Sequence, residues 1–138
     1  MSYVEEEDMI SADAPNISYY TEDEKLDIRK KEERRLKKIF KEYSTEINSL
    51  AKPLITSCAF MYAEIKEAEM QIQKNGSVEL YMNGKNQWGK KKSASVEVHN
   101  ILINNYTKVI KQLIDLLPKK SVNQALEEFG EFLGTSKN

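Results

Sequence analysis

Hydrophobic residues between positions 36 and 117 recur at three- and four-residue steps, the spacing that places side chains on one face of an α-helix. The first such segment has one apolar face, made of Leu36, Ile39, Phe40, Tyr43 and Ile47. It follows Thr21-Glu-Asp-Glu24, a capping-box pattern in which the Thr hydroxyl accepts from the backbone N–H of Glu24 and the Glu24 carboxylate reaches back. We therefore expect the first helix to begin at this tetrapeptide.

Two further segments each carry an a/d seam, the pattern of helices that pack side by side at a shallow angle. The first seam consists of Leu54, Cys58, Met61, Ile65, Ala68 and Ile72. The second consists of His99, Leu102, Tyr106, Val109, Leu113 and Leu116, with a neighbouring row of Val96, Ile103, Ile110 and Leu117. Matching seams and similar lengths predict an antiparallel helical hairpin.

Residues typical of helix ends give the expected limits of these two segments. Ser49 is a plausible N-cap of the first one, with Pro53 in its first turn, where a missing N–H has little effect. Gly76 is a natural residue to follow its last turn. Ser93 or Ser95 can cap the second one, and Pro118 ends it.

The connector between them, Tyr81-Met-Asn-Gly-Lys-Asn-Gln-Trp-Gly-Lys-Lys-Lys-Ser93, is longer than the two to eight residues that usually join helices. Val78–Tyr81 has a strand pattern, and Asn83-Gly84 supplies the positive-φ positions of a hairpin turn. With Gln87-Trp88 as the return strand, we expect a small β-hairpin at about residues 77–90. We expect its Tyr and Trp side chains to pack onto the helices, with contact to a partner as the alternative.

These patterns together predict a mostly α fold with three parts. Residues 21–118 form a helical domain with the β-hairpin between its two long helices. Residues 1–20, the acidic arm, lack helical periodicity, contain Pro15 and are expected to be disordered or peripheral. Residues 119–138 are expected to form a short C-terminal helix or tail, with one apolar side of Ala125, Leu126, Phe129 and Leu133.

Charge divides the chain more sharply than the net value of −1 suggests. Residues 1–24 contain eight acidic residues and no Lys or Arg, whereas the remainder carries 21 basic and 14 acidic residues, a net charge of +7. Such a split suggests a body that binds a polyanion, or a tail that regulates or mimics one; a tail that only aids solubility is the alternative. The lone Cys58 and the lack of a long apolar run fit a cytoplasmic protein without a membrane segment.

The sequence offers little catalytic chemistry. Its single histidine, His99, falls on an apolar stripe and is interpreted as a packed, hydrogen-bonded core residue. Cys58 lies on a seam, where a thiol behaves as a small hydrophobe. No glycine-rich phosphate loop or cluster of metal ligands is found. We predict a non-enzyme without metal or cofactor; a metal-free nuclease or transferase that depends on His99 is a third, weaker hypothesis.

Two groups of basic residues are candidates for contact with a polyanion. The first lies on the polar side of the first helix and comprises Lys31, Arg34, Arg35, Lys38 and Lys41. Neighbouring glutamates make an ordinary solvated surface the alternative for this group. The second comprises Lys90, Lys91 and Lys92, expected beside a helix N-terminus. Cations alone are mildly unfavourable there, whereas a phosphate would be favoured by both the lysines and the free backbone N–H groups.

The segment Glu79-Leu-Tyr-Met-Asn-Gly-Lys-Asn-Gln-Trp-Gly-Lys-Lys-Lys-Ser93, followed by Val98, Asn105-Tyr106, Ile110-Lys-Gln-Leu113 and Asp115-Leu-Leu-Pro118, resembles small terminase subunits of tailed phages. The similar branch is common in phages and prophages of Gram-positive bacteria. The resemblance covers roughly residues 30–120 and leaves the acidic arm without a counterpart.

This resemblance implies a non-catalytic adaptor for viral genome packaging in the host cytoplasm. Small terminase subunits recognise double-stranded viral DNA, assemble as rings, and deliver the DNA to the large terminase subunit, which holds the ATPase and nuclease. Both basic groups would then contact phosphates, with an affinity that falls steeply with salt. The alternative is a helical protein–protein interaction module that binds no nucleic acid and docks through its arm or C-terminal helix.

Overall fold

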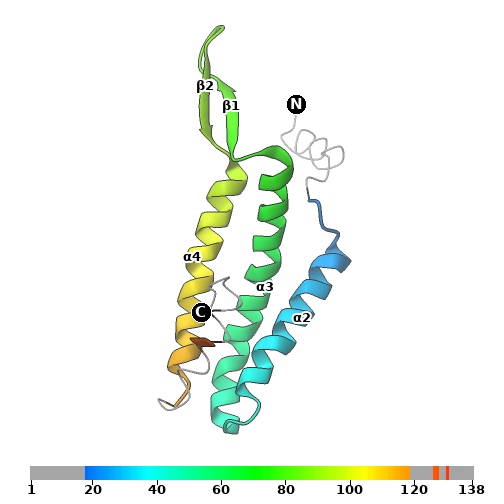
Figure 1. Cartoon of the computed structure of the whole chain (residues 1–138), viewed down its shortest axis with the longest axis vertical. Helices are drawn as coiled ribbons and strands as arrows, with labels where there is room; N and C mark the ends of the chain where they lie inside the picture. The colour runs from blue at the N-terminus through cyan, green and yellow to red at the C-terminus, as the bar shows by residue number, and fades with distance from the viewer. Residues whose placement is uncertain (1–17, 119–125, 128–129, 131–138) are drawn as a thin grey trace, which may run out of the picture.

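A computed structural model describes residues 18–118, 126–127 and 130. Its elements follow in the order α2 (Glu22–Phe40), α3 (Thr45–Asn75), β1 (Val78–Met82), β2 (Trp88–Lys92) and α4 (Ala94–Asp115). The helices lie side by side, each antiparallel to its neighbour along the chain, and the β-hairpin extends beyond one end of the bundle (Figure 1). The predicted fold class, mostly α with a β-hairpin between the two long helices, is confirmed.

The start of α2 is the predicted capping box. The Thr21 hydroxyl accepts from the Glu24 backbone N–H at 3.1 Å, and the Glu24 carboxylate accepts from the Thr21 N–H at 3.0 Å. Two of the N–H groups that a helix start leaves unpaired are thereby satisfied. The first helix therefore begins where its local sequence predicts.

The start of α3 differs from the prediction. Ser44, not Ser49, is the N-cap, and its hydroxyl accepts from the Ile47 N–H at 3.2 Å. Pro53 consequently lies inside the helix, where it removes one backbone hydrogen bond and opposes the helix by roughly 3 kcal/mol. Burial of Ala51 and Ile55 in the core outweighs this cost. α3 has 31 residues and α4 has 22, so the prediction that the two long helices are of similar length was wrong.

The core lies along α3 and receives side chains from all three helices. Of the predicted seam residues, Cys58, Ile65 and Ala68 on α3 and Tyr106 and Leu113 on α4 are buried. Leu54, Met61, Leu102 and Val109 pack around them at the margin. Leu36 and Phe40 bring α2 into the same cluster. Two residues of the second predicted apolar row also belong to it, Ile110 in α4 and Leu117 just after the helix ends. The wide apolar face of α4 nevertheless packs mainly against α3 and has little direct packing with α2.

The β-hairpin begins directly after α3. Gly76, with φ +84°, ends that helix as predicted, and its N–H donates to the Ile72 carbonyl at 2.8 Å. The strands pair antiparallel from Val78 opposite Lys92 to Met82 opposite Trp88. In the loop of residues 83–87, the positive-φ positions are Gly84 and Asn86, so the predicted Asn83-Gly84 pair supplies only one of them.

The last predicted segment falls almost entirely outside the described residues. Of its apolar side, Leu126 alone is described; it is helical and about half exposed. Residues 1–17 of the acidic arm also lie outside the described range. Within the part of the chain that the structure describes, no helix is long and apolar enough to cross a membrane.

Candidate nucleic-acid interface

A basic groove lies between α2 and α3 near the turn that joins them. Its volume is about 740 Å³, and its described lining consists of Arg34, Lys37, Lys38, Lys41, Asn48, Lys52 and Ile55. Five of these seven side chains are cationic. Such a concentration of positive charge around a hollow attracts anions more strongly than the same charges scattered over a surface.

Local sequence explains why the groove forms at this point. Arg34, Lys38 and Lys41 follow one another at steps of four and three, so they share a face of α2 and its continuation. The α2–α3 turn is held by Asn48, whose side-chain amide donates to the carbonyls of Phe40 at 2.8 Å, Tyr43 at 3.1 Å and Ser44 at 3.1 Å. The end of the groove is therefore fixed by hydrogen bonds rather than by packing alone.

The groove unites three of the predicted basic residues and adds two others. Lys31 continues the same stripe one turn away, but it does not line the groove and pairs with Asp27 at 3.0 Å on the exposed surface. Lys37 and Lys52 were not predicted. Because α3 begins after Ser44 and not after Ser49, Lys52 lies well inside the helix instead of in its first turn.

Arg35 has a different environment from its neighbour Arg34. Its guanidinium pairs with Glu32, a carboxylate that is almost fully buried. Burial raises the pKa of Tyr106 on α4, and the Arg35 charge opposes that rise. Burial raises the pKa of Glu32, and the adjacent Arg35 charge opposes that rise. Arg35 is thus held by the buried Glu32 carboxylate, and it is not among the residues that line the groove.

The Lys90–Lys92 segment lies in strand β2 and leads directly into the Ser-capped start of α4, as predicted. Ser93 alone separates it from α4, and the Ser93 hydroxyl accepts from the Val96 N–H at 3.2 Å. Because strand residues alternate between faces, Lys91 points to one side of the β-hairpin and Lys90 and Lys92 to the other. Lys91 lies 3.9 Å from Glu79 and 5.9 Å from the centre of the Tyr81 ring.

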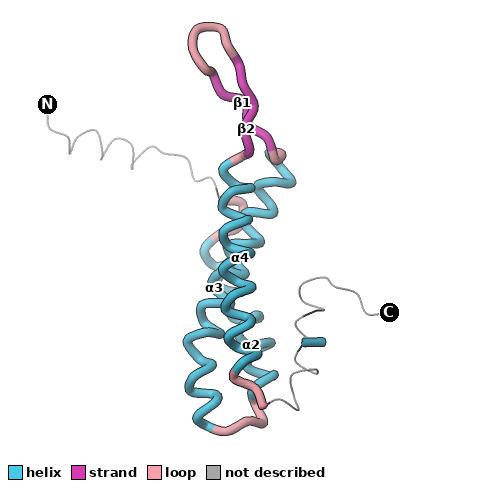
Figure 2. The backbone as a smooth tube through the Cα atoms, turned by 90° about the vertical axis from the view of Figure 1, so that its left-hand side faces the viewer, coloured by secondary structure: helices cyan, strands magenta, loops and turns pink. Residues whose placement is uncertain are grey.

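The aromatic residues of the β-hairpin do not pack onto the helices, so that prediction was wrong. Trp88 is 65% exposed and Tyr81 is 39% exposed. The β-hairpin continues the long axis of the bundle instead of folding back over it (Figure 2). Its base is closed by a 2.9 Å hydrogen bond from the Ser93 N–H to the Ser77 carbonyl, directly at the start of α4, which holds the strands in line with the helices.

The two residues considered for catalysis, His99 and Cys58, are engaged in contacts within the helical bundle. His99 is hydrogen-bonded as predicted, with its Nε2 3.2 Å from Glu69 of α3, but it lies at the edge of the core and keeps part of its surface in solvent. Cys58 is fully buried; burial, with a contribution from Glu32, raises the pKa of its thiol to about 12. Among the described residues, no group of three or more His, Cys, Asp or Glu could hold a metal ion.

Comparisons of the chain with models of known protein families, with curated proteins and with solved structures gave no match.

Proposed function

We propose that this protein is a terminase small subunit that binds viral DNA and passes it to the large terminase subunit. The observation that carries this proposal is the basic groove, in which Arg34, Lys37, Lys38, Lys41 and Lys52 surround one hollow. The resemblance to small terminase subunits supports it independently. Most of the residues on which the resemblance rests belong to the β-hairpin and α4, at a distance from the groove along the chain.

In this function the protein contributes binding rather than chemistry. The groove cations would neutralise DNA phosphates and release condensed counterions, and this contribution to the binding free energy does not depend on the DNA sequence. Phosphate contacts of this kind orient a duplex but do not read its bases. We therefore propose that the groove contributes affinity for DNA and orients the duplex, and we assign base recognition to no described residue.

Assembly into a ring is the second part of the proposal. Several large apolar side chains lie on the outside of the bundle, away from the core: Leu50, Phe60, Val98 and Ile101. Phe60 has the Arg29 guanidinium 5.2 Å from its ring centre, a contact that keeps part of the ring covered. We propose these outer residues as contacts between copies of the chain, and the large terminase subunit as the partner of the assembly.

The decisive experiment measures duplex binding as a function of salt. Fluorescence anisotropy of a labelled duplex should give an affinity that falls linearly on a log–log plot. The variant Arg34→Gln/Lys38→Gln/Lys41→Gln should reduce that slope by about 2.7 if each side chain contacts one phosphate. The matched control, Lys74→Gln/Lys108→Gln/Lys111→Gln, removes three exposed lysines elsewhere on the bundle and should leave the slope nearly unchanged.

The outcome that would contradict the proposal is equally definite. An equal loss of slope in both triple variants would show that only overall charge matters and that the groove is not the interface. A chain that is monomeric by light scattering and shows no salt-sensitive DNA binding would contradict the packaging function as a whole.

The alternative function is a protein-interaction module without nucleic-acid binding. The observation that favours it is the exposed Trp88 side of the β-hairpin, which no described element covers. This alternative predicts DNA affinity near zero for the native chain and for every lysine variant. The same anisotropy titration therefore separates the two functions.

A further inference from the structure

One face of the β-hairpin carries four large apolar side chains that are each more than half exposed. The register places Val78, Leu80, Met82 and Trp88 on this apolar face, together with Lys90 and Lys92, which lie directly opposite Leu80 and Val78. The four apolar side chains are 54%, 65%, 58% and 65% exposed, respectively. A two-stranded β-hairpin is only marginally stable by itself, and a contiguous exposed apolar patch marks an interaction site. The apolar face therefore requires an occupant.

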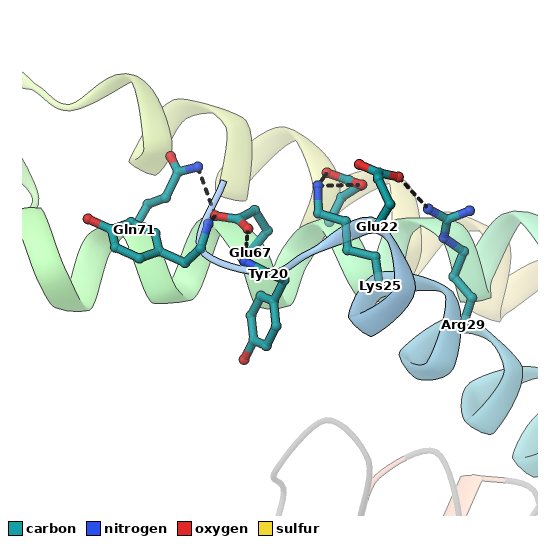
Figure 3. A network of polar contacts seen from close by, with 8 residues as sticks. Tyr20, Glu22, Lys25, Arg29, Glu67 and Gln71 are labelled. Atoms are coloured by element: carbon teal, nitrogen blue, oxygen red, sulfur yellow. Dashed lines mark hydrogen bonds and ion pairs between the residues drawn. The ribbon is translucent and has the colours of Figure 1, made fainter. Parts of the chain in front are cut away.

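The acidic arm enters the described structure at the same end of the bundle. The backbone N–H groups of Tyr19 and Tyr20 donate to the Glu67 carboxylate at 3.1 and 2.9 Å. Figure 3 shows this carboxylate on α3 between the side chain of Gln71 and the backbone of Tyr20. The Tyr19 hydroxyl also donates to Asn75, the last residue of α3, at 3.1 Å. The residues before Ser18 are thus tethered close to the base of the β-hairpin.

The length of the arm is sufficient to reach the apolar face. The fifteen residues from Tyr3 to Ile17 can span up to about 50 Å when extended. A five-residue strand is only about 17 Å long. The tether also keeps the arm at a local concentration of about a millimolar or more, which favours it over a second copy at ordinary protein concentrations.

The composition of the arm complements that of the β-hairpin. Residues 1–17 hold five acidic side chains and no basic one, a net charge of −5. The β-hairpin, residues 78–92, has four lysines and one glutamate, a net charge of +3. Apolar residues flank the acidic run of the arm on both sides: Tyr3, Val4, Met9 and Ile10. A segment with this order can place apolar side chains on the patch and carboxylates beside Lys90 and Lys92.

We propose that residues 3–13 of the acidic arm cover the apolar face of the β-hairpin of the same chain. Glu5, Glu6 and Glu7 lie next to Lys90 and Lys92, and the flanking apolar residues cover Leu80, Met82 and Trp88. This contact is independent of the proposed packaging function, since it needs neither DNA nor a ring.

The single tryptophan of the chain makes the contact directly measurable, because Trp88 lies on the apolar face. The test compares Trp88 emission and its quenching by acrylamide in the full native chain and in Glu5→Gln/Glu6→Gln/Glu7→Gln. We expect Trp88 of the variant to emit at longer wavelength and to be quenched more strongly. The ratio of covered to uncovered β-hairpin should fall about fivefold, a modest change, because each exposed ion pair contributes little to the free energy of the contact. The variant Lys90→Gln/Lys92→Gln removes the charges on the β-hairpin side of the same contact and should change Trp88 emission and quenching in the same way.

The matched control is Glu42→Gln/Glu46→Gln/Asp115→Asn, which removes three exposed carboxylates at the opposite end of the bundle and should leave Trp88 unchanged. Quenching in the native chain as strong as in the arm variant would overturn the proposal. Protection of Trp88 that increases with protein concentration would also overturn it, because the occupant would then be a second copy. Protection that is constant over concentration and lost in both charge variants is the expected result.

Discussion

Replacing Glu67 by glutamine tests whether one buried carboxylate fixes the arm against α3. Glu67 is only 4% exposed, and it accepts hydrogen bonds from the Tyr19 and Tyr20 backbone at 3.1 and 2.9 Å and from Gln71 at 2.9 Å. Hydrogen bonds to a charged group contribute about 1.5–3 kcal/mol each. Glutamine keeps one acceptor oxygen but turns an NH2 group toward the second backbone N–H. We therefore expect Glu67→Gln to lower the free energy of unfolding by about 2–3 kcal/mol.

The same substitution two residues away provides the control. Glu69 is on the same helix, but its side chain is 43% exposed and contacts Lys66 and His99 at 3.3 and 3.2 Å. Ion pairs at such sites contribute about 0.2–1 kcal/mol. Urea unfolding at neutral pH should therefore separate Glu67→Gln clearly from Glu69→Gln. Equal losses for the two variants would refute the role assigned to the buried carboxylate.

The dependence of this difference on pH gives a second check. Burial alone would raise the pKa of Glu67, but the N–H groups of Tyr20 and Tyr19 and the Gln71 amide together lower it below the ordinary 4.5. A carboxylate with a lowered folded-state pKa stabilises the protein fully above 4.5 and loses that effect as pH falls through the folded-state pKa. The gap between native chain and Glu67→Gln should hence shrink in acid. A gap that widens toward low pH would contradict the assignment.

Three further substitutions or reactions test other parts of the structure. A Cβ atom at Gly89 would lie 2.7 Å from the Tyr81 ring, so Gly89→Ala should destabilise the β-hairpin by about 1–3 kcal/mol. Faster amide exchange in the two strands would show this loss, and adding Tyr81→Ala to the same chain should remove the steric clash. Asn48→Ala removes the side-chain hydrogen bonds to three carbonyls of the α2–α3 turn, and it should lower the free energy of unfolding by about 1–3 kcal/mol in thermal unfolding. Asn48→Asp should be destabilised as well, because a carboxylate cannot donate a hydrogen bond to these carbonyls. Cys58, buried and with a pKa of about 12, should react with a thiol reagent at pH 8 only as fast as the protein unfolds, so its labelling rate should rise with urea.

Features that depend on a few adjacent residues were predictable from the sequence. The capping box at Thr21 and the Gly76 end of α3 require only local chemistry, and both are observed. The seams of α3 and α4 follow from periodicity over several turns. Pro53 misled the prediction of where α3 starts, because its preference for a first turn is weaker than the packing of Ala51 and Ile55, which sequence proximity does not reveal.

The candidate site was predictable only in part, because the sequence places basic residues on a helix face but does not show directly which of them point into the groove. Arg34 and Arg35 are neighbours in sequence, yet one lines the groove and the other points inward. The signal was present, since Arg35 precedes Ile39 of the apolar face by four residues and Glu32 precedes Leu36 by four. The open position of Trp88 had no such signal, because no local sequence pattern specifies whether the β-hairpin folds over the helices or extends beyond them.

The two basic groups cannot act as one compact site, because α3 separates them. The groove involves Asn48, Lys52 and Ile55 near the start of α3, whereas Lys90 and Lys92 lie beyond its other end. A helix of 31 residues is about 46 Å long, several times the screening length of about 10 Å at 0.1 M salt. Charge substitutions at the two ends should therefore act additively on the affinity for DNA. A duplex of one turn, about 34 Å, is too short to contact both groups, so the proposed binding to the groove and the proposed cover of the β-hairpin by the acidic arm are compatible.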